Sequence, residues 1–181
     1  DYFALLNDMF VDRWAKPWSR YCGEKGISWT GHYWEHSWPN VTGVIDNMSM
    51  AAWQQTPGID MLCNQFNEKD VHAQFGNIRS VKEVRSIANQ LGRQRVLSET
   101  YGAAGWEATF KDMKRLADWQ MVLGVNLVNQ HVGHMSLDGV RKFDYPPMFT
   151  RAASWWENYH VLNDYIARIC TVMSLGEQIN D

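Results

Sequence analysis

A regular alternation of short apolar runs and longer helical patterns constrains the fold of this chain more than any other feature. The apolar runs predict four strands, which begin near residues 27, 59, 95 and 125: Ile27–Thr30, Ile59–Cys63, Arg95–Ser98 and Val125–Val128. Helical spacing of apolar residues fills the stretches before, between and after them. A strand–helix alternation of this kind is typical of a parallel sheet with right-handed crossovers.

The distance between strand starts indicates which parallel fold to expect. It is about 32 residues, and a (β/α)₈ barrel of about 250 residues has roughly 31 residues per unit. We therefore predict an α/β fold of the (β/α)₈ TIM-barrel type, of which residues 1–181 supply about four βα units within a single catalytic domain. The remainder of the same polypeptide would complete the barrel. The alternative, an open doubly wound domain, is less favoured because no glycine-rich phosphate loop follows any predicted strand.

Capping residues and glycines predict the helix boundaries. A first helix spans Asp1–Gly26, with Pro17 expected to kink or split it. The S-x-x-E spacing of Ser80 and Glu83 predicts a capping box that begins a helix ending at Gly92, and Thr109 with Asp112 predicts another that ends at Gly124. The remaining helix-like stretches are 44–55 and 155–175.

Charge and cysteine content exclude several classes of protein. The net charge is −3, with 17 basic and 20 acidic residues spread along the chain, so a nucleic acid or an anionic membrane is not an expected partner. No apolar run approaches the roughly 20 residues of a membrane span, and no signal peptide opens the sequence. The three cysteines are far apart, and we expect buried free thiols.

The residues that follow each predicted strand are rich in groups that bind sugars. In parallel barrels the active site lies at the carboxyl ends of the strands. Amides, carboxylates and imidazoles hydrogen-bond to hydroxyls, and aromatic rings stack on C–H faces. This chain has ten tryptophans. The predicted carbohydrate contacts are His32, Trp34, Glu35, Asn64, Gln65, Tyr101, Trp106, Asn129, His131 and His134.

Glu99 is the candidate catalytic residue. Glycosidic bond cleavage needs two carboxyl groups, one of which stays protonated as the general acid. Glu99 ends a strand of apolar and small residues, and the bulk of Tyr101 and Trp106 would desolvate the carboxyl group and raise its pKa. An equally acceptable interpretation is that Glu99 only accepts hydrogen bonds, in which case the chain would be a carbohydrate-binding barrel without activity.

The stretch GHYWEHSW, residues 31–38, offers a different chemistry. His32, Glu35 and His36 have the H-x-x-E-H spacing of one class of zinc proteases, and with His131 they would make a zinc hydrolase. That motif needs an α-helix to bring its ligands onto one face, whereas here a strand leads into the motif and Pro39 follows it. The zinc site is therefore the minor hypothesis.

One long segment resembles a known family. RVLSETYGAAGWEATFKDMKRLADWQMVLGVNLVNQH, residues 95–131, resembles the catalytic barrel of glycoside hydrolase family 106, the α-L-rhamnosidases, and RKFDYPP and ASWWENYHVLNDYIARI resemble the loop and helix that follow. The resemblance is best over residues 80–175.

The resemblance implies an inverting, calcium-dependent hydrolase with Glu99 as the general acid, in a periplasmic or extracellular bacterial protein. The catalytic base would come from a later strand. The calcium ligands among these residues stay unassigned.

Overall fold

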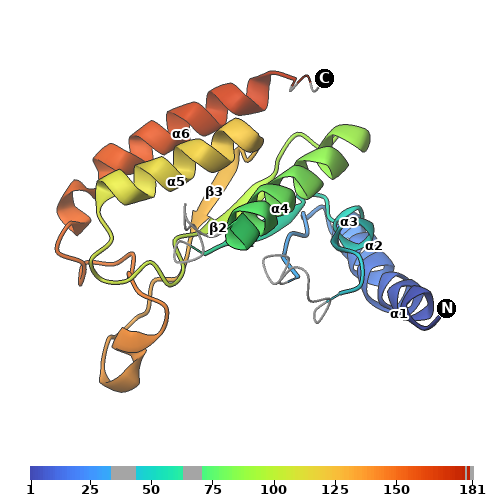
Figure 1. Cartoon of the computed structure of the whole chain (residues 1–181), viewed down its shortest axis with the longest axis horizontal. Helices are drawn as coiled ribbons and strands as arrows, with labels where there is room; N and C mark the ends of the chain where they lie inside the picture. Colours follow the sequence, from blue (N-terminus) through green and yellow to red (C-terminus); the bar gives the residue numbers. More distant parts are fainter. Residues whose placement is uncertain (34–43, 63–70, 178, 180–181) are drawn as a thin grey trace.

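The structure is a computed structural model, and it describes residues 1–33, 44–62, 71–177 and 179. Its centre is a parallel sheet in which β1 (Gly58–Met61), β2 (Leu97–Thr100) and β3 (Leu127–Gln130) lie in sequence order. Each strand is followed by a long helix: α4 (Val71–Gln90), α5 (Phe110–Leu123) and α6 (Tyr159–Leu175). Figure 1 shows α5 and α6 side by side, with the strands beneath them and α4 in front. The predicted parallel α/β alternation is confirmed for these three units.

The first predicted strand is wrong for the described residues, because Ile27–Thr30 is assigned to no sheet. The segment nevertheless runs beside the beginning of β1. Trp29 accepts a hydrogen bond from the Thr56 amide at 3.2 Å, and Gly31 accepts one from the Gln54 side chain at 3.0 Å. One backbone hydrogen bond and several from side-chain amides thus stand where a regular ladder would make this segment a fourth strand.

The N-terminal helix is continuous but not uniform. α1 (Tyr2–Phe10) passes through a π-helical turn, η1 (Val11–Ala15), into α2 (Lys16–Glu24). Pro17 has no amide hydrogen and its ring would clash with the carbonyl of Arg13, and a wider turn at this point removes the clash. We predicted that Pro17 would kink or split the helix, and the structure shows a change of helix type before it without a break.

Two other helix boundaries differ from the prediction. α3 covers Asn47–Ala51, shorter than the predicted 44–55, and the Asp46 side chain caps it by accepting from the Met48 and Ser49 amides. α4 begins at Val71, well before Ser80. Ser80 is buried inside the helix, and Glu83 lies 3.5 Å from Arg79 as an i,i+4 ion pair. The S-x-x-E spacing in this case does not mark a helix start.

The other capping signals are confirmed. Thr109 and Asp112 form a reciprocal capping box at the start of α5, and Gly124, with φ of 125°, ends that helix. α6 starts after a short 3₁₀ turn, η5 (Trp156–Asn158). The Asp112 carboxylate accepts hydrogen bonds from Thr109, which lower its pKa.

The core lies between the sheet and the helices. Ile59 and Met61 of β1 point into it, together with Met113 and Leu116 of α5. The middle strand contributes the polar Ser98 and Thr100, whose hydroxyls lie 2.9 Å apart. Gln120 of α5 donates to Thr100 at 3.0 Å, so the hydroxyls and the amide nitrogen of this buried layer are hydrogen-bonded.

Cys22 and Cys170 are buried free thiols, as predicted, and burial raises the pKa of Cys170. Cys63 lies outside the described residues. Over the part of the chain that the structure describes, no helix is long and apolar enough to cross a membrane.

Candidate active site at the carboxyl ends of the strands

A row of three polar residues crosses the sheet on the face away from the helices. The strand register pairs Asp60 with Glu99 and Glu99 with Asn129. Because side chains alternate along a strand, these three point to the opposite face from buried Ile59, Met61, Ser98 and Thr100. Neighbouring strands lie about 4.8 Å apart, so the three side chains form one compact polar row.

Two imidazoles approach the carboxylate of Glu99. His32 Nε2 lies 3.2 Å from Oε2, and His131 Nε2 lies 3.6 Å from Oε1. The three side chains are partly exposed, at 29% for Glu99, 32% for His32 and 18% for His131. The carboxylate is therefore within hydrogen-bonding distance of His32, lies just beyond that distance from His131, and can still be reached from solvent.

His32 is positioned by two neighbouring glutamines. The buried side chain of Gln54 donates to the Gly31 carbonyl and accepts from the Gly58 amide, both at 3.0 Å. Gln55 accepts from the Trp29 amide at 2.9 Å and donates to Ser19. The segment that carries His32 is thus fastened to β1 and to α2.

Gly58 is required for this close approach. A Cβ on this residue would lie 2.8 Å from Thr30 Oγ1 and 2.9 Å from the Gly31 carbonyl oxygen. A larger residue would push the segment, and His32 with it, away from the sheet.

His131 is positioned mainly by the sheet. Its amide donates to the Thr100 carbonyl at 2.7 Å, which extends the β2–β3 ladder by one residue. On one side its ring faces Gly102, where a Cβ would lie 3.1 Å from Cδ2 of the imidazole. Tyr145 covers it from the long loop, with ring centroids 5.8 Å apart.

The loop that follows β3 packs against the segment that follows β2. It contains a 3₁₀ turn, η4 (Gly139–Phe143). Trp106 Nε1 donates to the Lys142 carbonyl at 2.9 Å, and the Gly105 amide donates to the Pro146 carbonyl at 2.8 Å. His134 Nε2 lies 3.7 Å from Asp144 Oδ2. Trp106 thus holds the loop through its N–H, while its ring stays 42% exposed.

Tyr101 is placed differently from the sequence-based prediction. It is fully buried, its hydroxyl donates to the Met113 carbonyl at 3.0 Å, and its ring stacks on Phe149 at 5.7 Å. The residue has a positive φ of 78°, which turns the chain at the end of β2 and directs the ring into the core. This placement does not offer the phenol to a ligand.

Four predicted sugar contacts, Trp34, Glu35, Asn64 and Gln65, lie outside the described residues, as does His36 of the zinc hypothesis. Asn129 is exposed beside Glu99. Among the residues with a described position, no group of three or more His, Cys, Asp or Glu side chains could hold a metal ion.

Sequence reasoning missed Asp60. Its signal was a single acidic residue inside an apolar run, Gly58–Cys63. Asp60 lies inside its predicted strand and not after it, yet the register puts it level with Glu99.

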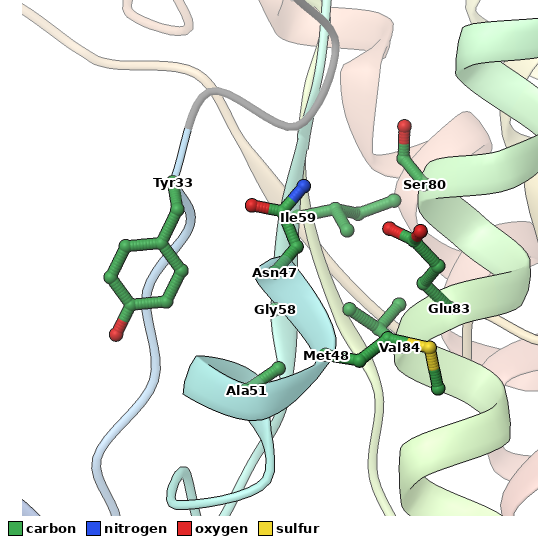
Figure 2. Close-up of a pocket in the computed structure, with 9 residues that line it drawn as sticks. All are labelled: Tyr33, Asn47, Met48, Ala51, Gly58, Ile59, Ser80, Glu83 and Val84. Atoms are coloured by element: carbon green, nitrogen blue, oxygen red, sulfur yellow. The ribbon is translucent and has the colours of Figure 1, made fainter. Parts of the chain in front are cut away.

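Two hollows differ in their suitability for a sugar. The one between Tyr33, α3, β1 and α4 (Figure 2) has a volume of about 10 Å³, room for a single water molecule. A hollow of about 630 Å³ lies under the loop beyond β3, lined among others by His134, Phe149 and Trp156. The larger one has the apolar wall and few polar groups that are typical of small-molecule sites.

Together these features define a class of protein: a parallel α/β domain with a carboxylate between two imidazoles at the carboxyl edge of its sheet. The family is more specific. The model of the glycoside hydrolase 106 family, described as alpha-L-rhamnosidase, matches residues 1–181, and the chain belongs to this family of glycosidases.

The rhamnosidase from Novosphingobium sp. PP1Y is a solved structure with a similar fold. The identity is 22% and the TM-score 0.74, over 94% of this chain and 16% of that one. The chain therefore spans about a sixth of the length of that rhamnosidase. No curated protein sequence matches the chain.

Proposed function

We propose that the chain supplies the general acid of an inverting glycoside hydrolase that cleaves a terminal, α-L-rhamnoside-like bond, with Glu99 as that acid. The observation that carries the proposal is the contact of each Glu99 carboxylate oxygen with an imidazole, 3.2 Å to His32 and 3.6 Å to His131. Membership of the glycoside hydrolase 106 family supports a carbohydrate substrate.

In the proposed reaction, protonated Glu99 gives its proton to the glycosidic oxygen as the bond to the anomeric carbon breaks. A water molecule attacks that carbon from the opposite face, and a second carboxylate takes its proton. Glu99 is then left as a carboxylate, and before the next turnover it regains a proton from solvent, directly or through the imidazolium form of His32 or His131. The two imidazoles are positioning and proton-returning groups in this scheme.

The remaining polar groups would bind the sugar. Asn129 lies beside Glu99 in the register, and His134 lines the larger hollow together with apolar side chains. The exposed ring of Trp106 offers a stacking face close to the same loop. Trp34, Glu35, Asn64 and Gln65 belong to the proposed sugar contacts on the grounds of sequence alone.

The proposal includes a complete (β/α)₈ barrel. Three parallel strands cannot close, so further strands of the same polypeptide would have to pair with the edges of this sheet. The catalytic base would lie on one of them, roughly 6.5–9.5 Å from Glu99 as an inverting mechanism requires. We also infer a periplasmic or extracellular location, from the family resemblance.

The family resemblance also makes calcium part of the proposal. Asp60 and Asn129 offer carboxylate and amide oxygens, the donor type that Ca²⁺ prefers, but the ion takes roughly 6–8 such ligands. These two would therefore need further donors from other segments or from the substrate. When bound, the ion would neutralise carboxylate charge and orient sugar hydroxyls.

Glu99→Gln in the intact protein that contains the chain tests this function. Turnover of an aryl α-L-rhamnoside should fall by about 10²–10⁴-fold, and the loss should grow with the pKa of the leaving group, because a poor leaving group needs the proton most. Binding of the sugar should survive. Glu157→Gln, at an exposed position outside the row, is the matched control. Unchanged turnover would remove Glu99 from the mechanism. Sugar binding without any turnover by the unchanged protein would favour a carbohydrate-binding barrel without activity.

A further inference from the structure

A polar hollow lies at the other end of the strands from Glu99. It has a volume of about 500 Å³ and its lining includes Arg85, Asn89, Arg93, Gln94, Ser174 and Glu177. Residues 92–94 lead into β2, so this hollow is at the amino ends of the strands, whereas Glu99 is near the carboxyl ends. Figure 1 shows the last turns of α4 and α6 at this same end of the helical layer.

Arg85 is an unusual residue for such a place. It is only 7% exposed, and its Nε is buried without a hydrogen-bond acceptor. Burial lowers the pKa of the guanidinium, although the group stays charged at neutral pH. Arg93 Nε is likewise buried without an acceptor. Within the described ranges 1–33, 44–62 and 71–177, neither arginine has an ion pair.

The charge of the lining is also unbalanced. It holds two guanidinium groups and one carboxylate, that of the exposed Glu177. A buried charge is normally paired, because an unpaired one keeps the full cost of its desolvation. Among the described residues, the lining therefore carries more positive than negative charge, and the buried Nε of each arginine lacks an acceptor.

The walls of the hollow are fixed before any ligand arrives. Gln94 Nε2 donates to the Ser174 carbonyl at 3.1 Å, and Asn126 Nδ2 donates to the Gln94 carbonyl at 2.8 Å. The Arg93 amide donates to the Ala88 carbonyl at 2.7 Å at the end of α4. These bonds join the ends of α4 and α6 around the two arginines.

We propose that Arg85 and Arg93 form a binding site for an oxyanion, a carboxylate or a phosphate. A guanidinium presents parallel N–H donors that match either group. The oxyanion has two possible sources, a small free anion or an acidic side chain from another part of the polypeptide. The site lies away from Glu99, so its failure would leave the proposed glycosidase function untouched.

Inorganic phosphate is the probe, titrated by calorimetry into the intact protein in phosphate-free buffer at constant ionic strength. Arg85→Met keeps most of the packing volume and removes the charge, and Arg93→Met does the same at the less buried position. Arg168→Met, on the exposed side of α6, is the matched control. Phosphate affinity should fall about 10–100-fold in each of the first two variants, the loss expected for a charged hydrogen bond, and stay unchanged in the control.

Thermal unfolding without phosphate distinguishes a small free anion from an acidic side chain of the polypeptide as the source of the oxyanion. If an acidic side chain of the polypeptide fills the site, phosphate will not bind through Arg85, and Arg85→Met will unfold at a lower temperature than Arg168→Met. If phosphate affinity does not depend on Arg85 and Arg85→Met is as stable as the control or more so, the hollow holds no oxyanion. That pair of results would overturn the proposal, because removing an unpaired buried charge stabilises a protein.

Discussion

The two histidines that contact Glu99 are held in place by different kinds of bond. His32 follows a segment that the Gln54 side chain joins to β1 and the Gln55 side chain joins to α2. His131 continues a strand, and its own amide is bonded to Thr100. A single substitution can release the first segment, whereas several backbone hydrogen bonds hold the second. The contact with Glu99 should therefore be easier to break on the His32 side.

Gln54→Leu should have the largest effect of the substitutions that probe this difference. It removes two hydrogen bonds and leaves the Gly31 carbonyl and the Gly58 amide without their partner, at a cost of about 2–4 kcal/mol of unfolding free energy. His32 should lose its position, and the alkaline limb of the pH–rate profile, where the general acid Glu99 loses its proton, should change with it. Denaturant unfolding and the pH dependence of kcat/KM measure the two effects.

Gln90→Leu is the control for that variant, since this exposed glutamine bonds only to Ser86 of the same helix among the described contacts. If Gln54→Leu is as stable and as active as Gln90→Leu, the glutamines do not position His32.

Gly102→Ala tests the His131 side and should cost about 1–3 kcal/mol, as overpacking does. The added Cβ would lie 2.8 Å from Leu62 Cδ2 and 3.1 Å from the His131 ring. The leucine tip can move aside more easily than the imidazole, which the ladder holds. Stability should therefore fall while the pH–rate profile changes less than in Gln54→Leu. Gly23→Ala, where a Cβ meets nothing within 4 Å, is the control.

A third substitution, Thr109→Ala, acts on α5, the helix that leads into β3. Loss of the capping box should cost about 1 kcal/mol and leave turnover unchanged, because no part of the proposed site depends on the cap. Chemical denaturation measures the loss of unfolding free energy, and steady-state kinetics measures turnover. A large fall in activity would mean that α5 positions His131 more tightly than the sheet does.

The smallest effect should be the pH dependence of the stability that the Thr109–Asp112 capping box contributes. Hydrogen bonds from Thr109 lower the pKa of Asp112 in the folded protein. The stabilisation is therefore complete above the ordinary pKa of 3.8 and is lost as pH falls through the folded-state pKa. Unfolding measured from pH 6 down to pH 2 should show a smaller acid-induced loss in Thr109→Ala than in the unchanged protein. Equal losses would exclude the cap as the cause.

The sequence by itself determined the local structure wherever a strong local signal was present. Parallel strands before α4, α5 and α6 followed from apolar runs and their spacing, and the start of α5 followed from Thr109 and Asp112. The signal failed at Ser80, because burial and an ion pair can place the same S-x-x-E spacing inside a helix. The choice of Glu99 as general acid stays a prediction.

Only the tertiary structure decided which side chains meet. Strand register placed Asp60 level with Glu99, 39 residues away in the sequence, and the glutamine contacts brought His32 to the same carboxylate. The structure also turned Tyr101 into the core and gathered Arg85 and Arg93 around one hollow. Helix caps and apolar periodicity are properties of a few consecutive residues, so a sequence contains them. Contacts between distant segments depend on register and packing, which are fixed only when the whole sheet and its helices have assembled.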